Sequence, residues 1–154
     1  MRRGLALLLA TSLAGCGGYT EAGLEEIAIP RFFEEARTIE DFGAQDFYCL
    51  ALSREGVASD PLPEVVDALG RDWDAAVLPN SRCRVADDGL VRADGQDGTG
   101  MLLTIADLRC FAARGCAASV SYYVGPDGAA GLDVMLHRNG RYYNVVRTDI
   151  SWVS

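Results

Sequence analysis

Two cysteines in the C-terminal part of the chain, Cys110 and Cys116, constrain its fold more than any other feature of the sequence. Residues 101–110 and 116–124 read as two strands around a short loop. If the cysteines lie opposite each other, an antiparallel register places an apolar set of side chains on their face, because side chains alternate with period two. The predicted pairs are Leu108 with Ala118, Ala106 with Val120, Thr104 with Tyr122 and Leu102 with Val124. The pattern predicts a hairpin closed by a disulfide, because directly opposite residues bring their Cβ atoms close to the ~4 Å that such a bond needs.

A second hairpin is predicted around Asn139-Gly140, because this dipeptide suits the two-residue turn between antiparallel strands. Strand-like residues 131–137 and 142–147 flank the turn. Within the last strand the patterned residues then shift from odd-numbered to even-numbered positions, so we expect a bulge near Val146-Arg147. The side chains that carry this inference are Leu132, Val134, Leu136, Tyr143 and Val145 on one face, followed by Thr148, Ile150 and Trp152 on even numbers.

Helical patterns precede these strands. Four apolar residues at helical spacing predict a helix that begins near Pro30, and Pro63 and Gly70 bracket a second, short helix. Helices followed by an antiparallel meander of three to four strands predict an α+β class, with one or two N-terminal helices packed on the sheet. This order, with the final strand pattern from Arg141 to Trp152, resembles the cystatin-like and NTF2-like folds. The four helical positions are Ile29, Phe32, Phe33 and Ala36.

The N-terminus carries a targeting pattern. Met1-Arg2-Arg3 is a basic head, residues 4–10 are apolar and uncharged, and small residues follow, as in a secretory signal. Leu13-Ala14-Gly15-Cys16 resembles the lipobox of bacterial lipoproteins. The resemblance implies that the signal is cleaved before Cys16 and that this cysteine carries the acyl chains, such as palmitate, that anchor the protein to a membrane. The alternative is an ordinary signal peptide with a cysteine nearby.

This resemblance sets the expected domain organisation and location. Residues 1–15 form the signal peptide, residues 16–23 a lipidated tether, and residues 24–154 a single α+β domain. Gly17, and not Asp, follows the cysteine, which in such lipoproteins favours the outer membrane. We therefore expect a lipid-anchored cell-envelope protein that faces the periplasm.

Four cysteines remain after Cys16, and an even number in an exported chain predicts disulfides. Three connectivities are open, and the hairpin geometry favours Cys110–Cys116, which leaves Cys49 to pair with Cys83. A zinc site is disfavoured, because no Cys-x-x-Cys occurs and the chain has one histidine. No metal and no cofactor is expected.

Charge also restricts the partners. The chain holds 22 acidic and 14 basic residues, for a formal net charge of −8. An acidic body argues against nucleic acid as a ligand and against a helix held on a membrane by charge. The expected partners are the membrane, through the lipid, and an unknown envelope protein or small ligand.

The chain has neither a phosphate-binding loop nor a Gly-x-Ser-x-Gly motif. An enzyme would need a pocket between helix and sheet, for which the candidates are Tyr122, Asp133, His137 and Tyr143. Asp133 and His137 also fit a plain strand surface, and the tyrosines fit ordinary strand propensity. The sequence therefore predicts a non-catalytic binding or interaction domain, with no catalytic residue assigned. A pocket enzyme of lyase or isomerase type and a structural envelope factor are the alternatives.

Overall fold

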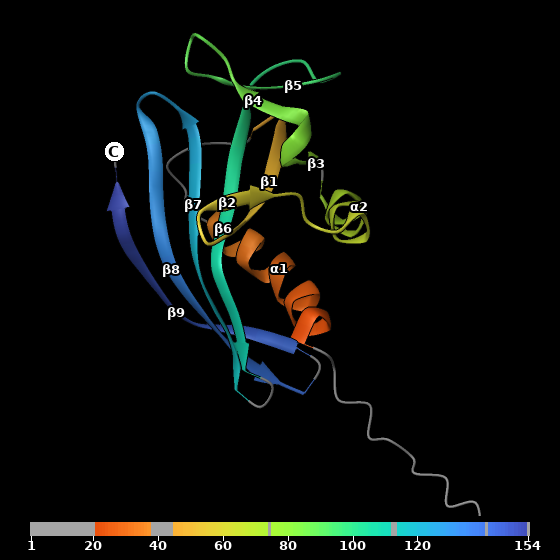
Figure 1. Cartoon of the computed structure of the whole chain (residues 1–154), viewed down its shortest axis with the longest axis vertical. Coiled ribbons are helices and arrows are strands. Elements are labelled where there is room, and N and C mark those ends of the chain that lie inside the picture. Colours follow the sequence, from red (N-terminus) through yellow and green to blue (C-terminus); the bar gives the residue numbers. More distant parts are fainter. Residues whose placement is uncertain (1–20, 38–44, 74, 112–113, 141, 154) are drawn as a thin grey trace, which may run out of the picture.

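The computed structural model describes residues 21–37, 45–73, 75–111, 114–140 and 142–153. Within them, two helices and a short 3₁₀ turn accompany nine strands of a single sheet (Figure 1). The helices are α1 (Glu21–Arg37) and α2 (Pro63–Asp72), and the 3₁₀ turn is Asn80–Arg82. The first five strands are short: β1 (Phe47–Arg54), β2 (Val57–Ser59), β3 (Ala76–Pro79), β4 (Cys83–Val85) and β5 (Val91–Ala93). The last four are long: β6 (Gly100–Phe111), β7 (Gly115–Gly125), β8 (Gly128–Asn139) and β9 (Tyr142–Val153).

The predicted α+β class is wrong, because the protein is mostly β. The main path of the sheet runs β2-β1-β6-β7-β8-β9, and β1 pairs in parallel with both β6 and β3. The antiparallel meander β6–β9 is therefore only part of a larger, mixed sheet of nine strands. The parallel partner of β6 lies about fifty residues earlier in the chain, where local patterns give no pairing signal.

The β6–β7 hairpin has the predicted Cys110–Cys116 pair, but the register differs from the prediction between Ala106 and the start of β6. The ladder shifts between Ala106 and Arg109, and Asp107 adopts a left-handed backbone with φ of 53°. This bulge moves the other β6 side chains to the opposite parity, so Leu103 and Ile105 enter the core. The pairs predicted for Ala106, Thr104 and Leu102 are therefore wrong by one residue, and Leu103 lies opposite Tyr122.

The β8–β9 hairpin confirms the predicted bulge. Leu136 pairs with Val145 and Met135 with Arg147, which leaves Val146 as the extra residue. A second shift lies near Ser151, because Gly131 pairs with Trp152 whereas Leu132 pairs with Ile150. Trp152 consequently lies on the outer face over Gly131, not on the face of Ile150 as its even number suggested.

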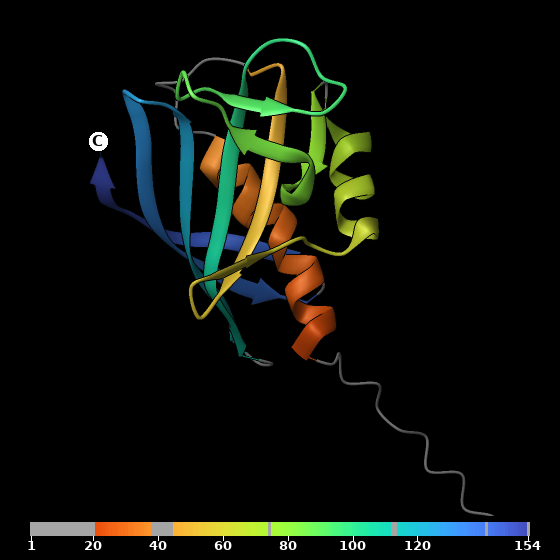
Figure 2. The ribbon, with the colours of Figure 1, turned by 45° about the horizontal axis from the view of Figure 1, so that its top comes forward.

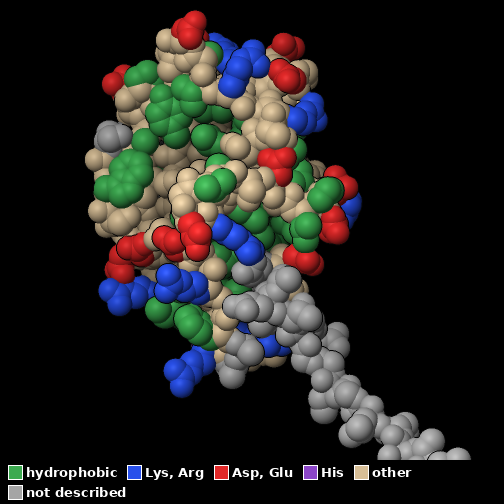
Figure 3. All heavy atoms as spheres, viewed as in Figure 1, with side chains coloured by type: hydrophobic (Ala, Val, Ile, Leu, Met, Phe, Trp, Pro, Cys, Tyr) green, Lys and Arg blue, Asp and Glu red, His purple; other side chains and the backbone are tan. Residues whose placement is uncertain are grey.

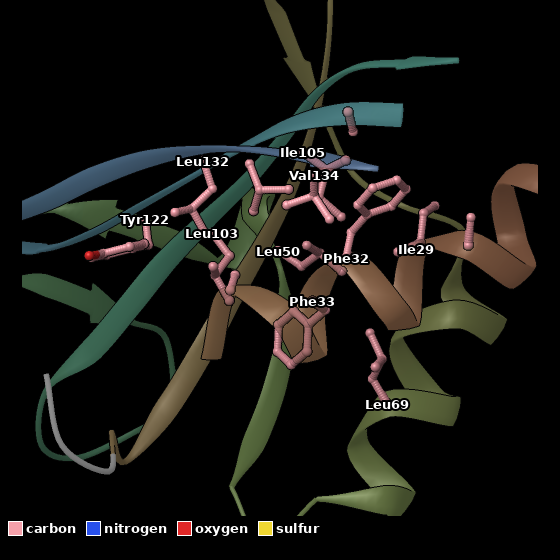
Figure 4. Packing of buried hydrophobic residues seen from close by; sticks show 14 of the residues in the cluster. Ile29, Phe32, Phe33, Leu50, Leu69, Leu103, Ile105, Tyr122, Leu132 and Val134 are labelled. Atoms are coloured by element: carbon pink, nitrogen blue, oxygen red, sulfur yellow. The ribbon is translucent and has the colours of Figure 1, made fainter. Parts of the chain in front are cut away.

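The core lies between the helices and one face of the sheet (Figures 2 and 4). Helix α1 is longer than predicted and contains Pro30, which removes one backbone hydrogen bond from its interior. The helix continues through the proline because residues on both sides of it, including Ile29 and Phe32, are buried against the strands. Figure 4 shows the side chains that close this layer: Phe33 from α1, Leu69 from α2, and Leu50, Leu103, Ile105, Tyr122, Leu132 and Val134 from the sheet.

Both predicted disulfides, Cys49–Cys83 and Cys110–Cys116, are confirmed. The first joins β1 to β4 across 34 residues and lies beside a small second core around Phe47 and Val91. The second closes the β6–β7 hairpin across six residues. Cys49 pairs with Leu102 near the start of β6, whereas Cys110 lies near its end, so the two bonds lie toward opposite ends of β6.

Candidate functional site

The four candidate pocket residues divide between the two faces of the sheet. Tyr122 and Tyr143 are buried in the core, on the face that α1 covers. Asp133 and His137 are exposed on the opposite face, because they alternate along β8 with the buried Leu132, Val134 and Leu136. They are four residues apart on one strand, which corresponds to about 13 Å. The sheet thus separates the tyrosines from the carboxylate and the imidazole.

Tyr143 is the one buried residue of β9. Desolvation of its ring hydroxyl raises the pKa of Tyr143 above the ordinary value of 10.0, and the nearby positive charge of Arg138 partly opposes the shift. A phenol whose pKa is raised is a weaker acid and holds even less phenolate at neutral pH, so its setting fits a packed core residue.

Asp133 belongs to a shallow groove on the outer face of the meander. The groove has a volume of about 400 Å³, and Ser119 Oγ donates a hydrogen bond to the Asp133 carboxylate at 2.8 Å. In the β8–β9 ladder, Asp149 lies opposite Asp133 and Arg147 lies opposite Met135. Arg147 also pairs with Asp149. The charged lining residues are Asp107, Arg109, Asp133, Arg147 and Asp149.

These charges lie on an exposed surface of the sheet. No group of three or more His, Cys, Asp or Glu in the described part of the chain could hold a metal ion. The acids lie next to arginines on a solvated surface, which is the setting of ordinary surface ion pairs. At the β4–β5 end, Asp88 accepts hydrogen bonds from the Leu90 N–H and the Arg92 guanidinium, and these lower the pKa of Asp88. That carboxylate closes the turn between the two short strands.

The edge strand β9 forms an exposed apolar surface that the sequence analysis did not identify. In the described part of the sheet, β9 pairs only with β8 and ends the strand order. All of its described side chains except Tyr143 are exposed, although half of them are apolar. Hydrophobic side chains gather around its C-terminal end in Figure 3. The exposed apolar residues are Tyr142, Val145, Val146, Ile150, Trp152 and Val153.

A sequence signal for this edge existed. Val145-Val146 and Trp152-Val153 are adjacent apolar pairs, and a strand with one buried face would alternate instead. Apolar residues on both faces of an exposed strand are unusual, because such an edge is a template for pairing with another chain. Of the charges that usually discourage such pairing, β9 holds only Arg147 and Asp149, and these two pair with each other.

Cys16, the predicted signal and most of the predicted tether lie outside the described residues, whereas residues 21–23 begin α1. None of the helices in the described ranges is long and apolar enough to cross a membrane. Comparison with known proteins finds no match to a protein-family model, a curated protein or a solved structure. The candidate site therefore rests on the geometry of this chain.

Proposed function

We propose that this protein is a lipid-anchored component of the bacterial cell envelope, at the outer membrane and facing the periplasm, whose domain binds a partner and catalyses no reaction. The lipobox-like Leu13-Ala14-Gly15-Cys16 supports the anchor. The two disulfides support an oxidising compartment, since such bonds persist mainly outside the cytosol.

The observation that carries the binding role is the exposed, apolar edge of β9. An extended segment of another envelope protein could add a strand to this edge, with main-chain hydrogen bonds supplying affinity and alternate side chains supplying selectivity. Ile150 and Val153 would then lose water contact on binding, as apolar side chains do in the centre of an interface.

A lyase or isomerase would require titratable groups that converge on one cavity. Tyr122 and Tyr143 face the core, whereas Asp133 and His137 lie on the other side of the sheet. The arrangement favours the binding role over that alternative.

The anchor is tested by Cys16→Ser. The parent protein should incorporate labelled palmitate and sediment with outer membranes, whereas C16S should do neither. Cys16 belongs to neither disulfide, so the variant leaves both bonds in place. Membrane association and labelling that persist in C16S would contradict the anchor.

The partner surface is tested by a photo-crosslinking amino acid placed at Ile150 in cells. Val57 on β2 is the matched control, because it is a β-branched strand residue of nearly equal exposure (69% against 67%). We expect a discrete adduct with an envelope protein from position 150 and none from position 57. The same pattern from both positions, or no adduct from position 150, would contradict a role for β9.

A further inference from the structure

Two hairpin ends of this acidic chain carry basic residues and no acidic ones. Residues 108–116 and 135–147 together contain five of the 14 arginines and none of the 22 acidic residues. Acidic residues lie close by in the sequence, namely Asp107 and Asp149 beside the two segments and Glu21, Glu25 and Glu26 in the first two turns of α1. The two segments themselves nevertheless carry only positive charge in a chain whose formal net charge is −8.

The two hairpin ends meet in space. The backbone N–H of Arg138 in β8 donates to the carbonyl of Arg114, which precedes β7, at 3.3 Å. Figures 1 and 2 both show that β6 and β8 end, and β7 and β9 begin, at the end of the molecule where α1 begins. The β7–β8 turn lies at the opposite end.

Apolar side chains accompany these arginines. Phe111 and Tyr142 are 54% and 71% exposed, and Val146 is also exposed. Phe111, Met135 and Val146 line a groove of about 250 Å³, with Arg114 and His137 among its polar residues. Figure 3 shows arginine and hydrophobic side chains together at the lower end of that view. Aromatic residues beside arginines are the combination that membrane–water interfaces favour.

We infer that this end of the domain, with Phe111, Tyr142, Arg109 and Arg114, rests on the anionic phospholipid surface of the membrane that holds the anchor. The inference rests on the proposed lipidation of Cys16. Four residues lie between Cys16 and Glu21, so even a fully extended chain spans only about 18 Å from one to the other. A lipid at Cys16 therefore holds the start of α1, and with it both hairpin ends, near the bilayer. The opposite charge of the headgroups then orients the domain with the β7–β8 turn away from the membrane.

The test uses full-length lipidated protein, purified from membranes and reconstituted into vesicles of brominated phosphatidylcholine with or without phosphatidylglycerol. Phe111→Trp places a fluorophore at the proposed contact, and Asp127→Trp, in the exposed β7–β8 turn, is the matched control at the far end. Quenching above that of the parent protein reports contact with lipid, and flotation of the vesicles reports the anchor. We expect quenching of F111W in the vesicles that contain phosphatidylglycerol, less in those without it, and none for D127W.

Arginine variants supply the charge control. Adding Arg109→Gln and Arg114→Gln to F111W should lower the docked-to-free ratio about five-fold per arginine, since each basic residue near an anionic surface is worth ~1 kcal/mol. Arg71→Gln with Arg84→Gln, two exposed arginines in α2 and β4, should leave the ratio unchanged. If F111W floats with the vesicles but is unquenched, or is quenched equally without phosphatidylglycerol, the docking is wrong and the anchor stands. If the protein does not float, the anchor fails and the docking fails with it.

Discussion

Strands β8 and β9 are neighbours of equal length, twelve residues each, yet their residues are buried to very different extents. Along β8, alternate residues from Leu132 to Leu136 are buried, whereas Tyr143 is the only buried residue of β9. Leu132 and its cross-strand partner Ile150 share one face, but they are 1% and 67% exposed. An apolar strand sequence is therefore not enough to form a core, because burial also needs cover from neighbouring elements.

The cover differs because of position in the sheet. β8 has β7 on one side and β9 on the other. β9 is last in the strand order, and α1 reaches it near Thr148, whose hydroxyl donates to Glu35. Apolar side chains on β8 therefore stabilise the folded protein, whereas those on β9, apart from Tyr143, remain exposed to solvent.

The largest effect that tests the comparison is expected from truncation of the paired residues. Leu132→Ala should lower the free energy of unfolding by about 2–5 kcal/mol, because it opens a cavity in the core. Ile150→Ala removes the same kind of side chain from the other strand and should change it by less than about 0.5 kcal/mol. Urea unfolding of both variants measures the difference. Equal losses would mean that β9 is part of the core.

A smaller effect is expected where the two strands touch. A Cβ at Gly131 on β8 would lie 2.1 Å from Trp152 Nε1 on β9, so Gly131→Ala must displace the indole. We expect a loss of about 1–3 kcal/mol, as for overpacking, with a change in tryptophan fluorescence.

Trp152→Ala is the control for that prediction. In the double variant G131A/W152A the clash is gone, so the double variant should lose less than the sum of the single losses. Additive losses would show that Trp152 does not cover Gly131.

The smallest effect concerns pH and the one buried residue of β9. Because burial raises the pKa of Tyr143, the folded state holds the phenol proton more tightly than the unfolded chain does. Its contribution is complete below the unfolded value of about 10 and declines as pH rises through the folded pKa. Tyr143→Phe should therefore flatten the alkaline decline in stability, measured by urea unfolding between neutral and alkaline pH. A decline as steep as that of the parent protein would mean that a group other than Tyr143 causes it.

Local signals predicted local structure well. The Cys110–Cys116 pair, the β8–β9 hairpin and the bulge at Val146 each rest on neighbouring residues, and all three are confirmed. The turn of that hairpin begins one residue later than predicted, because Asn139 ends β8 and pairs with Tyr142. Alternation failed at Asp107 and near Ser151, because a bulge inverts parity and neither position carries the glycine that marks many bulges.

Long-range features were beyond the sequence patterns. The parallel β1–β6 pair joins distant segments, and without it the α+β expectation followed naturally but wrongly. The exposed surface of β9 likewise could not be predicted without the order of the strands in the sheet. The apolar residues of β9 were visible in the sequence, but their exposure follows from the strand order, which no local pattern encodes.

Hydrogen exchange of the β8 and β9 amides, measured on the isolated protein and again in native outer-membrane vesicles, tests most directly whether β9 is an open edge that a partner occupies. We predict slow exchange along β8 in both samples, whereas outward-facing β9 amides should exchange fast in the isolated protein and slowly in the vesicles. Exchange in β9 that is as slow as in β8 in the isolated protein, or equally fast in both samples, would contradict this account.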